Sequence, residues 1–280
     1  MPTAQLLQRA ARERRGLGAF NVITLEYGEA IMAGAEQSRR PVILQVSENA
    51  ARFHGSLRPI TAALTELAAA AEVEVSLHLD HVEDEGLLHE SLSAGFSSVM
   101  FDAGRLPYAD NLAATTRATT WAHEHGLLIE AELGYVGGKD TQVTSAHAPG
   151  ARTDPEQASE FVSATGVDAL AVAVGSAHAM TSRVATLDHE LIAEIHRSVD
   201  VPLVLHGSSG VAVDDLSAAV GAGITKVNVG TLLSVAFTTS VREVLRSAPE
   251  LSDPRAYLAE ARGKIASVVA GMLEVIDHRP

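Results

Sequence analysis

Short β-branched runs alternate with alanine-rich stretches along almost the whole chain, and this alternation limits the folds open to it. The runs have the character of strands, and the stretches between them have the length and spacing of helices. We predict strands at 17–23, 42–47, 73–80, 97–102, 127–133, 169–175, 202–206 and 224–229. We predict helices at 25–39, 58–71, 83–94, 109–125, 154–165, 188–198, 214–222 and 231–247, and a C-terminal helix at about 254–276.

Eight strands, each followed by a helix, is the number that closes a TIM (β/α)8 barrel. An open doubly wound sheet is the main alternative, but its first turn is usually glycine-rich, and the first turn here reads FNVITLEYG. No Pro/Ser-rich linker divides the 280 residues. We therefore expect a single α/β domain, 1–280, with the C-terminal helix packed outside the barrel or against a partner subunit.

The composition excludes several classes of function. The chain has no cysteine, so a thiol nucleophile is impossible and a metal site would need histidine and carboxylate ligands. A formal net charge of −14 argues against a nucleic-acid partner, because such surfaces need clustered lysine and arginine. No secretory signal and no apolar stretch long enough for a bilayer is evident. We expect a cytoplasmic protein that has no membrane contact.

Polar residues follow the predicted strands, at the end of the barrel where active sites of this fold lie. Closure would bring three imidazoles to one mouth, and three imidazoles with an open position form a catalytic zinc site. A lone histidine is more often a hydrogen-bonded core or surface residue, so this interpretation depends on the strand assignments. The residues at the strand ends are Asn21, Ser47, Asp80 with His81, Asp102, Glu132, His178, His206 and Asn228.

Two further features suggest roles in binding or proton transfer. Asp80 would lie beside the metal as a general acid or base, although capping of the helix near Glu83 explains it equally well. The turns HGSSG at 206–210 and NVGT at 228–231 each lead into a helix, whose N-terminus can hold a phosphate.

Several motifs occur together in an order typical of one family: AFN at 19–21, PVILQVS at 41–47, HLDH at 78–81, EAELG at 130–134 followed by GG at 137–138, GSAH at 175–178, VPLVLHGSSG at 201–210 and TKVNVGT at 225–231. On these motifs the chain resembles the class II, metal-dependent ketose-bisphosphate aldolases of the fructose- and tagatose-bisphosphate type. The resemblance covers nearly the whole chain. It implies a zinc-dependent lyase of carbohydrate metabolism that acts on a sugar phosphate and forms a homodimer or homotetramer.

The resemblance also implies roles for individual residues. His81, His178 and His206 would bind the zinc ion, and Glu132 and Asp102 would form an alternative or second site for a divalent or monovalent cation. Asp80 would exchange a proton with the C4 hydroxyl. Asp140, which stands where the family usually has a loop glutamate, would remove a proton from dihydroxyacetone phosphate in the synthetic direction. Arg262 would bind a second phosphate. The residues that would hold the dihydroxyacetone phosphate end are Asn21, Ser47, Gly207, Ser208, Ser209, Asn228, Gly230 and Thr231.

Departures from the family pattern leave alternatives open. Ala179 and Ala259 replace a common glycine and an arginine found in some members, which leaves the acceptor aldehyde open. A sugar-phosphate sensor that has lost turnover is a second alternative, because of the altered Lys139-Asp140 pair. A Schiff-base aldolase using Lys226 and a zinc hydrolase are further alternatives.

Overall fold

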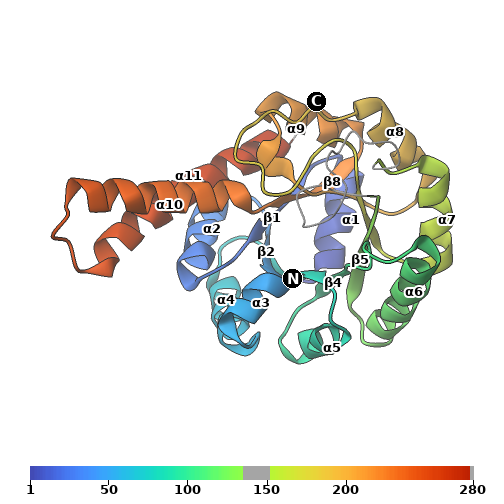
Figure 1. The fold of residues 1–280 in the computed structure, drawn as a ribbon, viewed down its shortest axis with the longest axis horizontal. Coiled ribbons are helices and arrows are strands. Elements are labelled where there is room, and N and C mark those ends of the chain that lie inside the picture. The colour runs from blue at the N-terminus through green and yellow to red at the C-terminus, as the bar shows by residue number, and fades with distance from the viewer. Residues whose placement is uncertain (135–151, 278–280) are drawn as a thin grey trace.

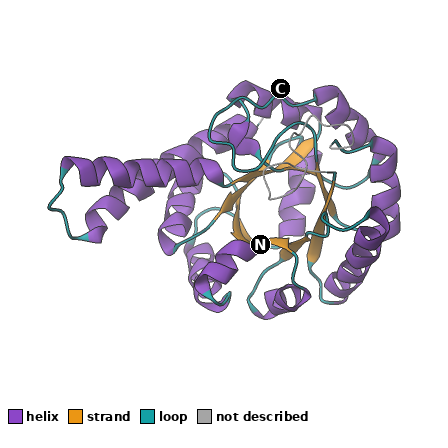
Figure 2. Ribbon diagram, in the orientation of Figure 1, coloured by secondary structure: helices purple, strands orange, loops and turns teal. Residues whose placement is uncertain are grey.

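The computed structural model describes residues 1–134 and 152–277 of the chain. Eight parallel strands form a closed barrel in which each strand pairs with the next in sequence and β8 pairs with β1 (Figure 2). The predicted TIM barrel is therefore confirmed. The strands are β1 (Leu17–Asn21), β2 (Val42–Ser47), β3 (Val75–Val82), β4 (Ser98–Phe101), β5 (Leu128–Leu133), β6 (Ala169–Val172), β7 (Leu203–Leu205) and β8 (Ile224–Val229).

Helices surround the barrel, as the alternating pattern requires (Figure 1). They are α2 (Leu25–Ser38), α4 (Arg58–Ala70), α5 (Glu85–Ser93), α6 (Tyr108–Glu124), α7 (Pro155–Thr165), α8 (His189–Ser198), α9 (Val213–Ala222), α10 (Thr231–Ser247) and α11 (Pro254–Ile276), with a 3₁₀ turn η1 (Ser208–Gly210) after β7. The observed boundaries differ from the predicted ones by a few residues at most, since the ends of an element are the part that a periodic pattern defines least well.

Two helices were not predicted. The first is α1 (Thr3–Glu13), which buries Leu6 and Leu7 against barrel residues such as Leu17 and Ile43. Figure 1 shows α1 across one opening of the barrel, and its contacts with β1, β3 and β8 place it there. The second is α3 (Glu48–His54), which lies between β2 and α4.

The strands bury side chains on both faces, as parallel strands in such barrels do. The face toward the helices carries the large apolar core, which includes Phe20, Leu44 and Leu79. The interior also contains charged residues without exposed surface, notably Glu130 and Lys226. Because burying a charge is unfavourable unless it is paired, these interior residues need specific partners.

The C-terminal helix lies outside the barrel. α11 packs against α2 and α10, and together α10 and α11 extend away from the barrel as an arm (Figure 1). Gly34 of α2 permits the close approach, since a Cβ there would lie 2.6 Å from the carbonyl oxygen of Ala266. None of the helices in the described part of the chain combines the length and the apolar character that spanning a bilayer requires.

Candidate metal centre and active site

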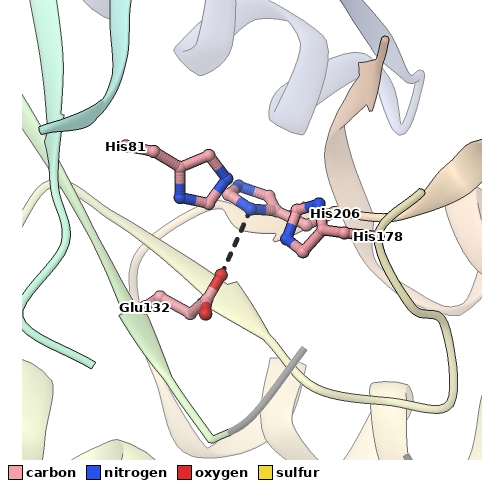
Figure 3. A group of neighbouring side chains, drawn as sticks. All are labelled: His81, Glu132, His178 and His206. Atoms are coloured by element: carbon pink, nitrogen blue, oxygen red, sulfur yellow. Dashed lines mark ion pairs between the residues drawn. The ribbon is translucent and has the colours of Figure 1, made fainter. Parts of the chain in front are cut away.

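Four side chains, two from strands and two from the residues that follow β6 and β7, converge at the mouth of the barrel (Figure 3). His81, Glu132, His178 and His206 each offer one nitrogen or oxygen atom, and these atoms all lie within 4.8 Å of one another. The ring centroids of His81 and His206 are 4.7 Å apart, and those of His178 and His206 are 5.6 Å apart. We call these four residues the metal-ligand group.

The backbone at the end of β3 explains how His81 reaches this group. His81 has φ of 50°, in the left-handed region that few non-glycine residues occupy. The pairing of β3 with β4 shifts register between Leu79 and Val82, and such bulges redirect side chains at barrel rims. The other members come from β5 and from the residues after β6 and β7, with His178 in the loop beyond β6.

The metal-ligand group contains buried polar atoms whose hydrogen-bonding capacity is not used. Nδ1 of His206 and Oε2 of Glu132 lie 3.2 Å apart as an ion pair, but neither atom has a hydrogen bond of good geometry. Burial lowers the pKa of His206, but Glu130 and Glu132 outweigh it and raise the pKa to about 9. At a pKa of about 9 the ring carries a proton on Nδ1 at neutral pH. A divalent cation would replace this proton and bind both Nδ1 of His206 and Oε2 of Glu132. Three imidazoles and a carboxylate are ligands that such a cation accepts, so the group fits a metal ion.

Residues outside the metal-ligand group hold two of its histidines in place. Asp102 contacts His81, with Oδ2 lying 2.8 Å from Nδ1. Glu130 contacts His206, with Oε1 lying 3.0 Å from Nε2. Carboxylates in this position orient a metal-binding imidazole. Asp102 therefore lies outside the group and reaches it through His81, whereas the sequence analysis placed it among the metal residues.

Asp80 lies beside the metal-ligand group and is 2% exposed. Its carboxylate accepts a hydrogen bond of 3.0 Å from Gln45 and one of 3.5 Å from Asn228. Burial raises the pKa of Asp80, but the neighbouring His81 and His206 outweigh it and lower the pKa, so the group is ionised. An ionised carboxylate here is suited to accept a proton.

The alternative explanation of Asp80 as a helix cap is excluded. The N-cap of α5 is Asp84, whose side chain accepts a hydrogen bond from the backbone N–H of Leu87. Asp80 is still within β3.

A cavity of about 280 Å³ opens beside the metal-ligand group, at the ends of β7 and β8. Gly230 precedes the first residue of α10 without a side-chain cap, so the helix N-terminus can face an anion there. Gly207 has φ of 68°, which brings the backbone after β7 close to Ala177. All the residues expected at the dihydroxyacetone phosphate end line this cavity: Asn21, Ser47, Gly207, Ser208, Ser209, Asn228, Gly230 and Thr231.

One predicted site residue lies away from this cavity, and another falls outside the described residues. Arg262 of α11 forms an ion pair with Glu29 of α2 on the outer surface, and it does not line the cavity. Asp140 lies outside the described residues, as does the neighbouring Lys139.

Lys226, the alternative Schiff-base nucleophile, is fully buried. Its Nζ lies 2.6 Å from Oε2 of Glu130, and it does not line the cavity. Because Lys226 is buried beneath the cavity and is ion-paired with Glu130, it cannot attack a substrate carbonyl held in the cavity.

The sequence analysis missed two polar residues inside strands. Gln45 donates to both Asn21 and Asp80, at 2.8 and 3.0 Å. Glu130 holds His206, as described above. A signal was present, because both residues interrupt apolar runs, and Glu130 shares a strand face with Glu132.

Comparisons with known proteins agree with this geometry. The model of the family described as "Fructose-bisphosphate aldolase class-II" matches residues 1–279. A Bacillus subtilis (strain 168) protein described as "Probable fructose-bisphosphate aldolase" is 37% identical over 271 residues, which are 96% of this chain and 94% of the relative. The fructose-bisphosphate aldolase of Geobacillus stearothermophilus is 36% identical over the same shares of the two chains.

A solved structure shows the same similarity at the level of the fold. The crystal structure of the YdjI aldolase from Escherichia coli K12 superposes with a TM-score of 0.84 at 30% identity, covering 98% of this chain and 96% of that chain. The chain therefore belongs to the class-II fructose-bisphosphate aldolase family and is an enzyme of the lyase class.

Proposed function

We propose that the protein reversibly cleaves a ketose 1,6-bisphosphate of the fructose or tagatose type, with a zinc ion in the metal-ligand group. The products would be dihydroxyacetone phosphate and an aldehyde such as glyceraldehyde 3-phosphate. The observation that carries this proposal is the convergence of His81, His178, His206 and Glu132 next to an ionised Asp80, at one mouth of the barrel.

Asp80 acts on the proton of the substrate's C4 hydroxyl. As the carboxylate accepts this proton, the O–H electrons form the aldehyde carbonyl and the C3–C4 bond breaks. The bonding electrons stay on the three-carbon ketone fragment as negative charge. A divalent cation held by the metal-ligand group supplies Lewis-acid stabilisation of that charge. Gln45 and Asn228 hold the Asp80 carboxylate for the transfer.

The ketone fragment must then gain a proton at C3, and in the synthetic direction the same proton is removed. The sequence analysis assigns this role to Asp140, which lies outside the described residues, so the assignment stays a prediction. The phosphate of the fragment fits the cavity at the N-terminus of α10, where Gly230 and Thr231 offer backbone N–H groups.

An assay of the purified protein tests the proposal. We expect cleavage of fructose or tagatose 1,6-bisphosphate to stop when a chelator removes the metal and to return with added zinc. His178→Ala should bind less metal, whereas His196→Ala, at an exposed position of α8, should bind the wild-type amount. Full activity of the metal-free protein would refute the metal-dependent mechanism. Binding of a dihydroxyacetone phosphate analogue without cleavage of any ketose bisphosphate would favour the sensor instead.

The acceptor, the subunit number and the location of the protein stay predictions. Arg262, the residue expected to bind the second phosphate, is paired with Glu29 on the outer surface, and an aldolase with another aldehyde acceptor is the alternative. A panel of aldehydes condensed with dihydroxyacetone phosphate would identify the acceptor. Light scattering would test the expected homodimer or homotetramer, and cell fractionation the expected cytoplasmic location.

A further inference from the structure

An ion pair between Glu130 and Lys226 lies beneath the metal-ligand group. Nζ of Lys226 is 2.6 Å from Oε2 of Glu130, and neither side chain has any exposed surface. Removing both charges from water is unfavourable by several kcal/mol per ion, and apolar residues in the same place are often as stable or more stable. Fold stability alone therefore does not account for this pair.

The second oxygen of the Glu130 carboxylate determines which nitrogen of His206 carries a hydrogen. Oε1 of Glu130 lies 3.0 Å from Nε2 of His206. An ionised carboxylate can only accept, so Nε2 must donate. Nδ1, which faces Glu132 at 3.2 Å, is then the nitrogen that can lose its hydrogen and offer a lone pair to a cation. Glu130 thus selects the tautomer of His206 that is competent to bind metal.

Lys226 is in turn positioned by His78. Nζ of Lys226 lies 3.3 Å from Nε2 of His78, and because an ammonium can only donate, Nε2 must accept. Nδ1 of His78 then donates to Oγ of Ser98 over 2.8 Å. Burial and the charge of Lys226 lower the pKa of His78 to about 3, so the ring is neutral as this pattern requires.

The series of contacts ends on the helix that closes the barrel. Oγ of Ser98 donates to Oγ1 of Thr3 over 2.7 Å, and Thr3 is the first residue of α1. Each donor in the series meets an acceptor, so all the hydrogen positions are mutually consistent. The buried polar column formed by Thr3, Ser98, His78, Lys226 and Glu130 therefore runs from α1 to His206.

We propose that Glu130 and Lys226 are positioning residues that fix the tautomer and orientation of His206, and so set the affinity of the protein for its metal ion. This inference rests on the metal site proposed above. Loss of an outer partner of this kind typically weakens metal binding by about 10–100-fold. The buried pair is then explained by metal binding, since Lys226 keeps the Glu130 carboxylate charged and in place.

Two double variants separate this role from a purely structural one. Glu130→Leu/Lys226→Met replaces the pair with apolar side chains and leaves no unpaired buried charge. Glu130→Gln/Lys226→Met has the same net charge as the first variant, but it keeps an oxygen that can accept a hydrogen bond from Nε2 of His206. We expect the first variant to bind Co²⁺ or Zn²⁺ about 10–100-fold more weakly than the wild type, and the second to bind more tightly than the first. Lys264→Met, at an exposed position of α11, is the matched control and should bind as the wild type does.

The measurement is a competition titration against a chromogenic chelator at fixed pH. Equal metal binding by both double variants, whether close to the wild type or equally weak, would overturn the proposal, because only the oxygen facing His206 distinguishes them. If the wild type binds no divalent cation, the proposed metal site itself fails. If the wild type binds tightly and the Leu/Met variant binds equally well, only the positioning role fails.

A second measurement needs no variant and so does not depend on folding of the mutants. In ¹⁵N-histidine spectra of the wild-type protein loaded with ¹¹³Cd²⁺, we expect coupling of the cadmium to Nδ1 of His206 and a hydrogen on Nε2. Coupling to Nε2 of His206 would overturn the assignment.

Discussion

Nε2 of His81 lies 3.9 Å from Oδ2 of Asp80, although the two residues are consecutive on β3. Neighbouring residues of a regular strand point to opposite faces. The left-handed backbone at His81 and the register shift against β4 break this alternation, so both side chains face the mouth of the barrel. The proposed proton acceptor and one metal ligand are thereby supplied by a single dipeptide. A non-glycine residue in this conformation is unfavourable by about 1–3 kcal/mol, and such strain is typical of functional sites.

The position of Asp80 predicts a defect in chemistry without loss of metal. Asp80→Asn keeps the size of the side chain but cannot accept the C4 proton, so kcat for cleavage should fall by about 10²–10⁴-fold. The metal content per chain should not change, because Asp80 is not in the metal-ligand group. Asp84→Asn, which alters the N-cap of α5, is the control and should keep kcat. A variant at position 80 with wild-type kcat would rule out the role in proton transfer.

The contact between Asp102 and His81 predicts the opposite pattern. Asp102→Ala removes the acceptor 2.8 Å from Nδ1 of His81, so the ring loses its fixed orientation. Metal affinity should fall by about 10-fold or more, and activity should return when excess zinc is supplied. Competition with a chelator measures the affinity, with Asp110→Ala in the first turn of α6 as the control. Unchanged affinity would show that His81 is held by other contacts.

The buried His78 predicts a dependence of stability on pH. Its pKa is about 3 in the folded protein and 6.5 as the ordinary value, so the unfolded chain binds a proton in this interval that the folded protein does not. The free energy of unfolding should therefore fall as the pH drops below 6.5, by up to about 1.4 kcal/mol per pH unit. The lowered pKa of Glu130 acts in the same direction at lower pH.

Urea unfolding of the metal-free protein between about pH 6 and 5 measures this dependence, because His206, whose pKa is raised, is largely protonated there in both the folded and the unfolded protein. His78→Gln should have a shallower slope than the wild type, whatever its absolute stability. His196→Gln, at an exposed position, should keep the wild-type slope. Parallel curves for His78→Gln and the wild type would contradict the prediction.

The turn after β7 predicts a steric effect that can be separated from backbone strain. Gly207 and Gly55 both have positive φ, of 68° and 72°, so alanine at either position should lower the free energy of unfolding by about 1–2 kcal/mol. At Gly207 a Cβ would also lie 2.6 Å from the carbonyl oxygen of Ala177, whereas at Gly55 nothing lies within 4 Å. Gly207→Ala should therefore lose about 1–3 kcal/mol more.

The same comparison has a functional readout. Because Gly207 lines the cavity, Gly207→Ala should also bind a dihydroxyacetone phosphate analogue more weakly, and Gly55→Ala should not. Calorimetric titration with that analogue measures the difference. Equal affinities of the Gly207→Ala and Gly55→Ala variants would show that the turn after β7 does not contribute to phosphate binding.

Local sequence patterns were sufficient for the barrel and for the ends of its strands. Hydrophobic periodicity and β-branched runs depend on residues close in sequence, so β2 and β8 were predicted with their observed bounds. The same patterns missed α1, because an amphipathic helix outside the repeating unit has no place in the count of strands and helices. They also left Asp80 ambiguous, since capping and catalysis both place an aspartate at the end of a strand.

The sequence by itself determined the residue types available at the barrel mouth, including the three histidines and the carboxylates that follow the strands. Only the tertiary structure decided which of them meet: it placed Glu132 with the histidines, Asp102 behind His81, Glu130 behind His206, and Arg262 on the outer surface. The physical reason is that barrel closure sets distances between residues far apart in the chain. Hydrogen bonds and charge pairs then form according to those distances, which no local pattern records.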